Sequence, residues 1–169
     1  DRSDVFFSLQ SAMMTLPTPV PTVLTRSSVP DLLANEYWVC DKSQGSRIMV
    51  YAADNVLYFL DSRFFVFRVT TVPETVRDTF VTGPTLLDAH LNGETVTVFD
   101  VVELNGVSLR QLNLSERLVA IGSIVIAQFR ETLRPHIGFE MIGKRVHRLS
   151  RIRDIFQHLK KRSYRTFEY

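Results

Sequence analysis

The stretch SRIMVYAADNVLYFLD, residues 46–61, decides the fold class of this chain. It contains two runs rich in Val, Ile, Tyr and Phe, residues 46–53 and 56–61, and the Ala-Asp-Asn break between them suits a tight connection. Two strand-like runs separated by so short a break predict a pair of antiparallel strands.

Similar runs continue on both sides of this pair. The breaks at residues 43–45 (Ser-Gln-Gly) and 92–94 (Asn-Gly-Glu) are again short enough for tight connections between neighbouring strands. The sequence therefore predicts a mostly antiparallel sheet. Its further strands are expected at residues 36–42, 64–70, 85–91 and 95–104.

Helices are expected later in the chain. Asn113 lies three residues before Glu116 in a capping-box-like start, and apolar residues then recur at helical spacing. This helix should pack on the sheet through Leu114, Leu118, Ile121, Val125 and Phe129. One more strand is expected at 138–149 and an amphipathic helix at 150–162, whereas four prolines within residues 16–30 predict an extended arm there.

The size and composition fit one α+β domain. A chain of 169 residues, 45% of them hydrophobic, is large enough for a real core. We expect residues 1–15 to be an N-terminal extension and residues 16–169 to be the domain. Because the chain begins with Asp1 rather than Met, we expect it to be a segment of a longer protein.

The sequence favours a soluble protein without a membrane partner. It has no apolar run near the roughly 20 residues that cross a bilayer, and its N-terminus lacks a signal pattern. The single Cys40 forms no disulfide within the chain, which favours an intracellular compartment. Nucleus, cytoplasm and organelle are all left open.

Charge is unevenly distributed along the chain. Residues 1–100 hold 7 Lys and Arg against 12 Asp and Glu, whereas residues 144–165 hold 9 Lys and Arg against one Asp. Such a basic end binds phosphate or nucleic acid, and RNA is the expected partner. The alternative is a solvated cationic helix face. The candidate contacts are Arg145, Arg148, Arg151, Lys160 and Lys161.

The segment YWVCDKSQGSRIMVY, residues 37–51, places Lys42 at a strand end, Gly45 three residues later and Arg47 two beyond that. A lysine amine attacks the α-phosphate of a nucleoside triphosphate only when it is uncharged, which requires burial or neighbouring cations. A glycine allows close backbone approach, and an arginine suits ribose or phosphates. The alternative for Lys42 is an exposed lysine at a strand end.

This segment resembles the Lys-x-Asp-Gly-x-Arg element of the covalent nucleotidyltransferases, which include the mRNA capping guanylyltransferases and the DNA and RNA ligases. Later stretches are similar to family elements in the same order, and the resemblance covers about residues 15–165. It favours the capping branch over the ligases. These stretches are VLYFLDSRFFVF (56–67), TLLDAHL (85–91), FDVVELNG (99–106) and GFEMIGK (138–144).

The resemblance implies an ATP-grasp-like nucleotidyltransferase fold, with twisted antiparallel sheets flanked by helices. It also implies that Lys42 is the catalytic nucleophile, and that Asp88 and Asp100 are weak candidates for a metal site. Each aspartate has a plainer alternative as a strand-end or turn carboxylate. The implied nucleotide-binding residues are Gly45, Arg47, Arg63, Phe65 and Lys144, where Arg63 comes one residue after the family's arginine position, which Ser62 occupies.

Key acidic positions of the family pattern are replaced. Gln44 stands in place of the aspartate, and Ala89-His90 stands in place of Gly-Glu. A histidine there removes a hard oxygen ligand suited to Mg²⁺ or Mn²⁺. The chain also ends about where the family's Asp-Gly-Leu-Ile element would begin. We therefore expect the rest of the core and the OB-fold domain to lie outside this chain, and the segment alone not to be a competent enzyme.

Three hypotheses follow from the sequence. The first is a degenerate guanylyltransferase-like domain that binds nucleotide or RNA, or serves as a structural component, with other protein subunits of an RNA-processing or ribonucleoprotein assembly. The second is an active, divergent capping guanylyltransferase that uses GTP and Mg²⁺ or Mn²⁺ and passes GMP through Lys42 to the 5′ end of RNA. The third is a polynucleotide ligase relative that uses ATP or NAD⁺.

Overall fold

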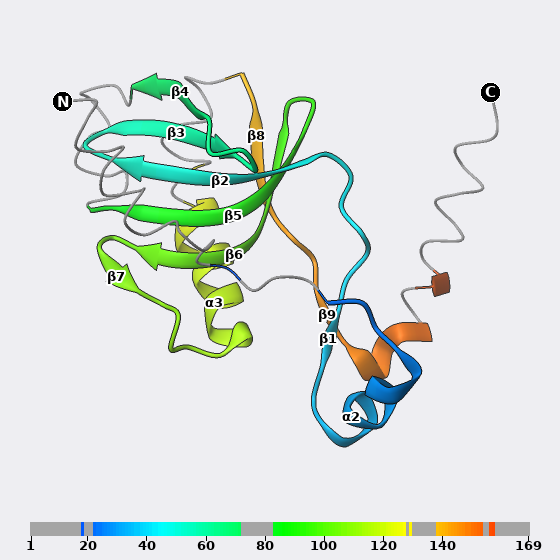
Figure 1. The fold of residues 1–169 in the computed structure, drawn as a ribbon. Coiled ribbons are helices and arrows are strands. Elements are labelled where there is room, and N and C mark those ends of the chain that lie inside the picture. Colours follow the sequence, from blue (N-terminus) through cyan, green and yellow to red (C-terminus); the bar gives the residue numbers. More distant parts are fainter. Residues whose placement is uncertain are drawn as a thin grey trace, which may run out of the picture. The chain divides into compact units, whose positions relative to one another are not determined.

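The computed structural model describes residues 18, 22–71, 83–127, 129, 138–153 and 156–157 (Figure 1). The chain forms two compact units. Unit 1 combines Asp1–Val20 with Ser43–Gly143, and unit 2 combines Pro21–Lys42 with Lys144–Tyr169. Each unit thus brings together segments that are far apart in the sequence.

Unit 1 is built around one sheet. Among its described residues, seven strands have the order β4-β3-β2-β5-β6-β7, and β8 pairs with β6. Neighbouring strands are antiparallel except β6 and β8, so the predicted, mostly antiparallel sheet is confirmed. The strands are β2 (Ser46–Ala53), β3 (Val56–Asp61), β4 (Val66–Thr71), β5 (Thr85–Asn92), β6 (Thr95–Leu104), β7 (Val107–Ser108) and β8 (Glu140–Gly143).

Two of the predicted tight connections are confirmed. The β2–β3 hairpin turns at Asp54 and Asn55, whose φ angles are 49° and 60°. Asp and Asn tolerate this left-handed region better than other residues with a side chain, and two in succession suit a two-residue hairpin loop. The β5–β6 hairpin turns at Gly93, with φ of 55°.

The tight connection predicted at residues 43–45 is wrong. The strand before it, β1 (Trp38–Val39), is shorter than the expected 36–42 and pairs with β9 (His147–Arg148). β2 pairs instead with β3 and β5. Pairing also depends on which face each strand buries, so a short break alone does not make its flanking strands partners.

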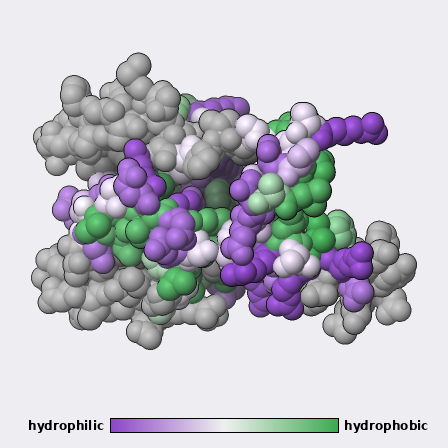
Figure 2. All heavy atoms as spheres, turned by 90° about the horizontal axis from the view of Figure 1, so that it is seen from below, coloured by the Kyte–Doolittle hydropathy of each residue, from purple (hydrophilic) through white to green (hydrophobic). Residues whose placement is uncertain are grey.

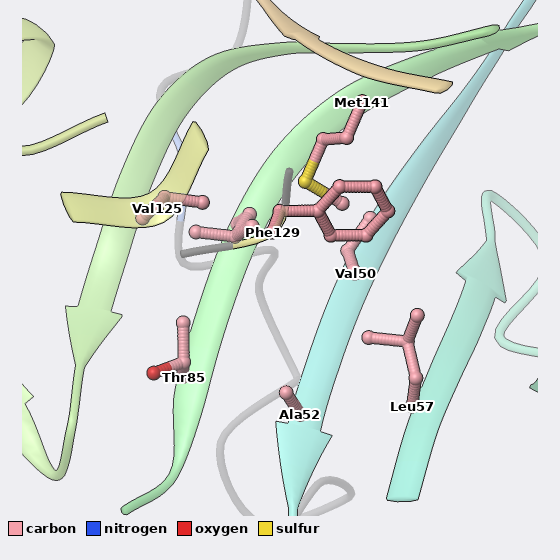
Figure 3. A pocket seen from close by; sticks show the side chains of 8 residues that line it. Val50, Ala52, Leu57, Thr85, Val125, Phe129 and Met141 are labelled. Carbon is pink, nitrogen blue, oxygen red and sulfur yellow. The ribbon is translucent and has the colours of Figure 1, made fainter. Parts of the chain in front are cut away.

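The predicted helix packs on one face of the sheet. α3 (Leu114–Ala120) begins with the predicted capping box, in which the Asn113 side chain accepts from the Glu116 backbone N–H at 3.1 Å. It continues as a π-helix, η3 (Ile121–Ile126). Val125 and Phe129 point to a small apolar cavity of about 20 Å³ that Val50 and Met141 also line (Figure 3). The hydrophobic spacing read from the sequence therefore identified this core.

Unit 2 contains short elements. The extended arm predicted for residues 16–30 is wrong at its end, because η1 (Arg26–Ser28) and α2 (Val29–Ala34) form there. Pro30 lies in the first turn of α2, where a helix does not need the missing N–H. The strand expected at 138–149 is interrupted between β8 and β9, and η6 (Leu149–Arg151) follows.

Residues 152–153 and 156–157 are helical, and the remainder of the helix predicted at 150–162 lies outside the described residues, as does the N-terminal extension at 1–15. In the part of the chain that the structure describes, no helix has the length and apolar character to cross a membrane.

Candidate functional site

Arg47 and Asp88 form the central ion pair of unit 1. Arg47 Nε donates to Asp88 Oδ1 at 3.0 Å, and Nη2 donates to Asp88 Oδ2 and to Thr18 Oγ1. The Asp88 side chain is only 1% exposed, against 27% for Arg47. The hydrogen bond to Asp88 raises the pKa of Arg47 above its ordinary value, against the opposing effect of burial. A two-point contact of this kind fixes the plane of the guanidinium.

Two aromatic rings complete this cluster on neighbouring strands. His90 is the cross-strand partner of Arg47, so their side chains lie on the same face of the sheet. The His90 ring lies 4.9 Å from the ring of Phe99, and the Arg47 guanidinium carbon lies 5.7 Å from the same ring centre. We refer to Arg47, Asp88, His90 and Phe99 as the Arg47 cluster.

Asp100 is held by a different arginine. Arg117 of α3 donates from Nε at 2.7 Å and from Nη2 at 3.1 Å to its two oxygens. Both side chains are mostly buried, at 13% and 16% exposed. The two aspartates considered as metal candidates therefore each face an arginine.

Lys42 lies in unit 2, between β1 and the start of unit 1, and its side chain is exposed. The neighbouring Asp41 forms an ion pair of 3.0 Å with Lys144, whose side chain is 7% exposed. Lys144 is thus placed beside the residue that precedes the lysine of the motif. Gln44, which replaces the family's aspartate, is exposed.

Gly45 has a structural reason to be glycine. Its φ is 107°, and a Cβ atom built there would lie 2.2 Å from the carbonyl oxygen of Leu91 on β5. No side chain fits in that space. The glycine of the motif is therefore required by the packing of unit 1 itself, whatever else it contacts.

Arg63 and Phe65 lie in the turn between β3 and β4. The Asp61 side chain organises this turn by accepting from the backbone N–H of both residues, at 2.8 and 3.0 Å. The Phe65 side chain is 60% exposed, and Arg63 is exposed as well. No described contact links either residue to the Arg47 cluster.

The basic residues predicted to bind nucleic acid belong to unit 2. Arg145 and Arg151 are exposed, and Arg148 forms a 3.0 Å ion pair with Glu36 that is open to solvent. Lys160 and Lys161 lie outside the described residues.

The described carboxylates do not form a donor set that fits a divalent metal. The described residues include no group of three or more His, Cys, Asp or Glu side chains that could hold an ion. Mg²⁺ and Mn²⁺ prefer carboxylate oxygens, and Asp88 and Asp100 direct theirs at arginines. The cavity of Figure 3 is no nucleotide site either, because it is small and almost wholly apolar.

The described part of the structure, an antiparallel sheet with a few short helices, is compatible with an α+β nucleotidyltransferase-like domain. The chain matches the family of the mRNA capping enzyme, catalytic domain, over residues 3–166. It therefore belongs to this family, as the resemblance predicted, and the match supports a guanylyltransferase-like function. No curated protein sequence matches the chain.

Sequence reasoning missed Phe99 as a member of the cluster. Burial alternates along the first half of β6, with Val96 and Val98 in the core. Phe99 is half-buried on the opposite face, beside His90. The alternation in the sequence was the available signal for this placement. Thr18, whose hydroxyl accepts from Arg47, had no comparable signal.

Proposed function

We propose that this chain is a guanylyltransferase-like domain that binds a guanine nucleotide at the Arg47 cluster but has lost most of its capacity to transfer GMP. It serves, with RNA and other protein subunits, in an RNA-processing or ribonucleoprotein assembly. The observation that carries the loss of transfer is the pairing of Asp88 and Asp100 with arginines, next to a histidine in place of the family's glutamate.

The loss of transfer follows from charge. Nucleotidyl transfer builds negative charge on the phosphates, and bound cations and metal ions stabilise it. A carboxylate that already holds a guanidinium through two hydrogen bonds has its charge balanced by that cation, and it therefore attracts a divalent ion less strongly than an unpaired carboxylate does. His90 supplies a nitrogen where a hard oxygen ligand would suit Mg²⁺ or Mn²⁺.

Two side chains of the Arg47 cluster, Arg47 and Phe99, support nucleotide binding. The described residues provide no acceptor for Arg47 Nη1, so its two N–H groups remain for a phosphate or ribose oxygen. Phe99 adds a half-buried ring of the kind on which a base stacks. Binding needs fewer aligned groups than transfer does, so it outlives the loss of the metal ligands.

The test separates binding from transfer. The protein is incubated with α-labelled GTP and Mg²⁺ or Mn²⁺, and the denatured protein is examined for a covalent GMP adduct beside an active capping enzyme. We expect no adduct, while equilibrium dialysis of the native protein detects bound GTP. Phe99→Leu should weaken that binding about tenfold, the usual size of one lost base-stacking contact.

Phe65→Leu is the matched control, because it makes the same change at an exposed ring. An equal loss of GTP affinity in Phe65→Leu would indicate that the base stacks at the β3–β4 turn instead. Absence of GTP binding by the folded protein would refute the proposal. A GMP adduct that disappears in Lys42→Ala would refute the loss of transfer.

Two observations favour the active alternative. Lys42 is present, and the Asp41–Lys144 ion pair anchors the residue before it. In an active guanylyltransferase, the neutral Lys42 amine would form a bond from Nζ to the α-phosphorus of GTP and release one proton to solvent, while the bond to the bridging oxygen breaks and pyrophosphate leaves. The adduct assay decides between this alternative and the proposal.

A further inference from the structure

Unit 2 contains an open groove of about 540 Å³, lined by residues of α2, by β1 and by the segment from β9 through η6. Its walls combine an aromatic ring with cations. Trp38, Arg148 and Arg153 line it, together with Leu33, which is 83% exposed. The volume lies within the range of about 300–1,000 Å³ that is usual for ligand sites.

The pairing of β1 with β9 brings the ring and a guanidinium together. Trp38 and Arg148 are direct cross-strand partners, so their side chains lie on the same face of the two-stranded ladder. Trp38 is 36% exposed although it is a large aromatic residue. The neighbouring backbone is fixed by the Leu149 N–H, which donates to the Tyr37 carbonyl at 2.8 Å.

Cations outnumber carboxylates among the residues that line the groove, which are Arg148 and Arg153 against Glu36, and also among the described residues of unit 2. The described residues of unit 2 include three carboxylates, Asp31, Glu36 and Asp41, against seven cations. The ion pair at the groove, Arg148 with Glu36, has side chains 63% and 82% exposed, and an exposed pair is worth little to the fold. Arg148 therefore exchanges Glu36 for a phosphate at small cost. The seven cations are Arg26, Lys42, Lys144, Arg145, Arg148, Arg151 and Arg153.

We propose that this groove binds single-stranded RNA, with one base stacked on Trp38 and adjacent phosphates held by Arg148 and Arg153. An exposed ring flanked by guanidinium groups matches unstacked bases on a polyanion. In the view from below, hydrophobic and strongly hydrophilic residues lie next to one another on the described surface (Figure 2). The choice of RNA rests on the proposed role in RNA processing and not on nucleotide transfer.

The protein carries its own probe for this test. Trp38 is the one tryptophan of the sequence, so tryptophan fluorescence reports on the groove directly. Titration of the whole chain with a 12-nucleotide oligouridylate should quench this fluorescence with a saturating curve. Inorganic polyphosphate of similar charge should quench it weakly, because it has no base to stack.

Variants identify the groups involved. Affinity is measured by anisotropy of a labelled oligouridylate, and circular dichroism verifies the fold. Trp38→Ala should weaken binding about tenfold or more. Arg148→Gln should weaken it less and lower the slope of log K against log salt by about one. Trp38→Phe, which keeps a ring, should recover most of the affinity.

Arg110→Gln is the control, because it removes the same charge from an exposed arginine of unit 1. Equal losses in Arg110→Gln and Arg148→Gln would overturn the proposal, as would RNA binding that leaves the tryptophan signal unchanged. Self-association that buries Trp38 in the absence of RNA would also overturn it, since the occupant would then be a second copy. If the unmodified protein binds RNA but does not bind GTP, the proposed nucleotide binding is refuted and the proposal for the groove is not.

Discussion

Arg47 shows how one side chain serves the fold and still has capacity for a ligand. Its Nε and Nη2 groups hold Asp88 and Thr18, which ties β2 to β5 and to Thr18. Its Nη1 group has no acceptor among the described residues. A guanidinium fixed in this way loses little conformational freedom when it binds a phosphate.

Removal of the Asp88 charge should therefore damage the fold. Asp88→Asn leaves Arg47 mostly buried beside a neutral group, and we expect unfolding to become easier by about 2–4 kcal/mol. Urea denaturation measures this. Glu36→Gln breaks an exposed ion pair and should change stability by no more than about 0.5 kcal/mol. Similar small effects from both substitutions would show that the Asp88 pair contributes little to the fold.

Tyr51 makes stability depend on alkaline pH. Burial, together with the charges of Glu103 and Asp54 and the neighbouring Tyr58, raises the pKa of Tyr51 above its ordinary value of about 10. The unfolded chain then loses this proton at a lower pH than the folded one. The stability contributed by the neutral hydroxyl is present below about pH 10 and is lost as pH rises from there through the folded pKa.

Tyr51→Phe should thus reduce the loss of stability between pH 9 and pH 11, as measured by denaturation at both values. Tyr37→Phe removes a tyrosine that is 39% exposed and serves as the control. An unchanged pH dependence in Tyr51→Phe would contradict the prediction.

The sequence predicts correctly those helix and strand limits that are determined by neighbouring residues. The bounds of β2, β3 and β6 agree with those read from the sequence, because hairpin turns at Asp54-Asn55 and Gly93 limit them. The start of α3 agrees because the Asn113 cap is itself local. The sequence predicts a longer β1 next to β2 and one continuous strand in place of β8 and β9, since the β1–β9 pairing joins residues about 110 positions apart and leaves no local signature.

The candidate site residues also differ in whether the local sequence identifies their role. The Lys42 segment and the motif order were sufficient to identify the family, which the match over residues 3–166 confirms. The pairing of Asp88 with Arg47 and of Asp100 with Arg117 joins different elements, and no spacing in the sequence reveals it. The sequence therefore leaves both aspartates as metal candidates or as strand-end or turn carboxylates, without their arginine partners.

The loop before β2 depends on one glycine. In Gly45→Ala, the new methyl group would meet the Leu91 carbonyl at 2.2 Å in a backbone conformation with φ of 107°. We expect a loss of about 2–4 kcal/mol in the free energy of unfolding, from strain and overpacking together. Gly122→Ala in η3 meets no atom within 4 Å and should be neutral or slightly stabilising. Equal effects at the two glycines would contradict this account of the motif glycine.

In the whole molecule, the two proposed binding sites lie in different units. The Arg47 cluster lies in unit 1, and the groove lined by Trp38 and Arg148 lies in unit 2. No described residue belongs to both. If each unit has its own ligand, nucleotide binding and RNA binding should be separable by mutation.

Phe99→Leu should weaken GTP binding about tenfold and leave oligouridylate binding unchanged. Arg148→Gln should weaken oligouridylate binding by less than about tenfold and leave GTP binding unchanged. In the double variant, each loss should equal that of the single variant within about 0.5 kcal/mol, because sites without shared residues behave additively. Isothermal titration of GTP and of oligouridylate into the unmodified protein, the two single variants and the double variant measures these affinities. A larger loss of GTP affinity in the double variant than in Phe99→Leu would mean that Arg148 also contributes to GTP binding. Nucleotide binding and RNA binding would then not be separable by mutation.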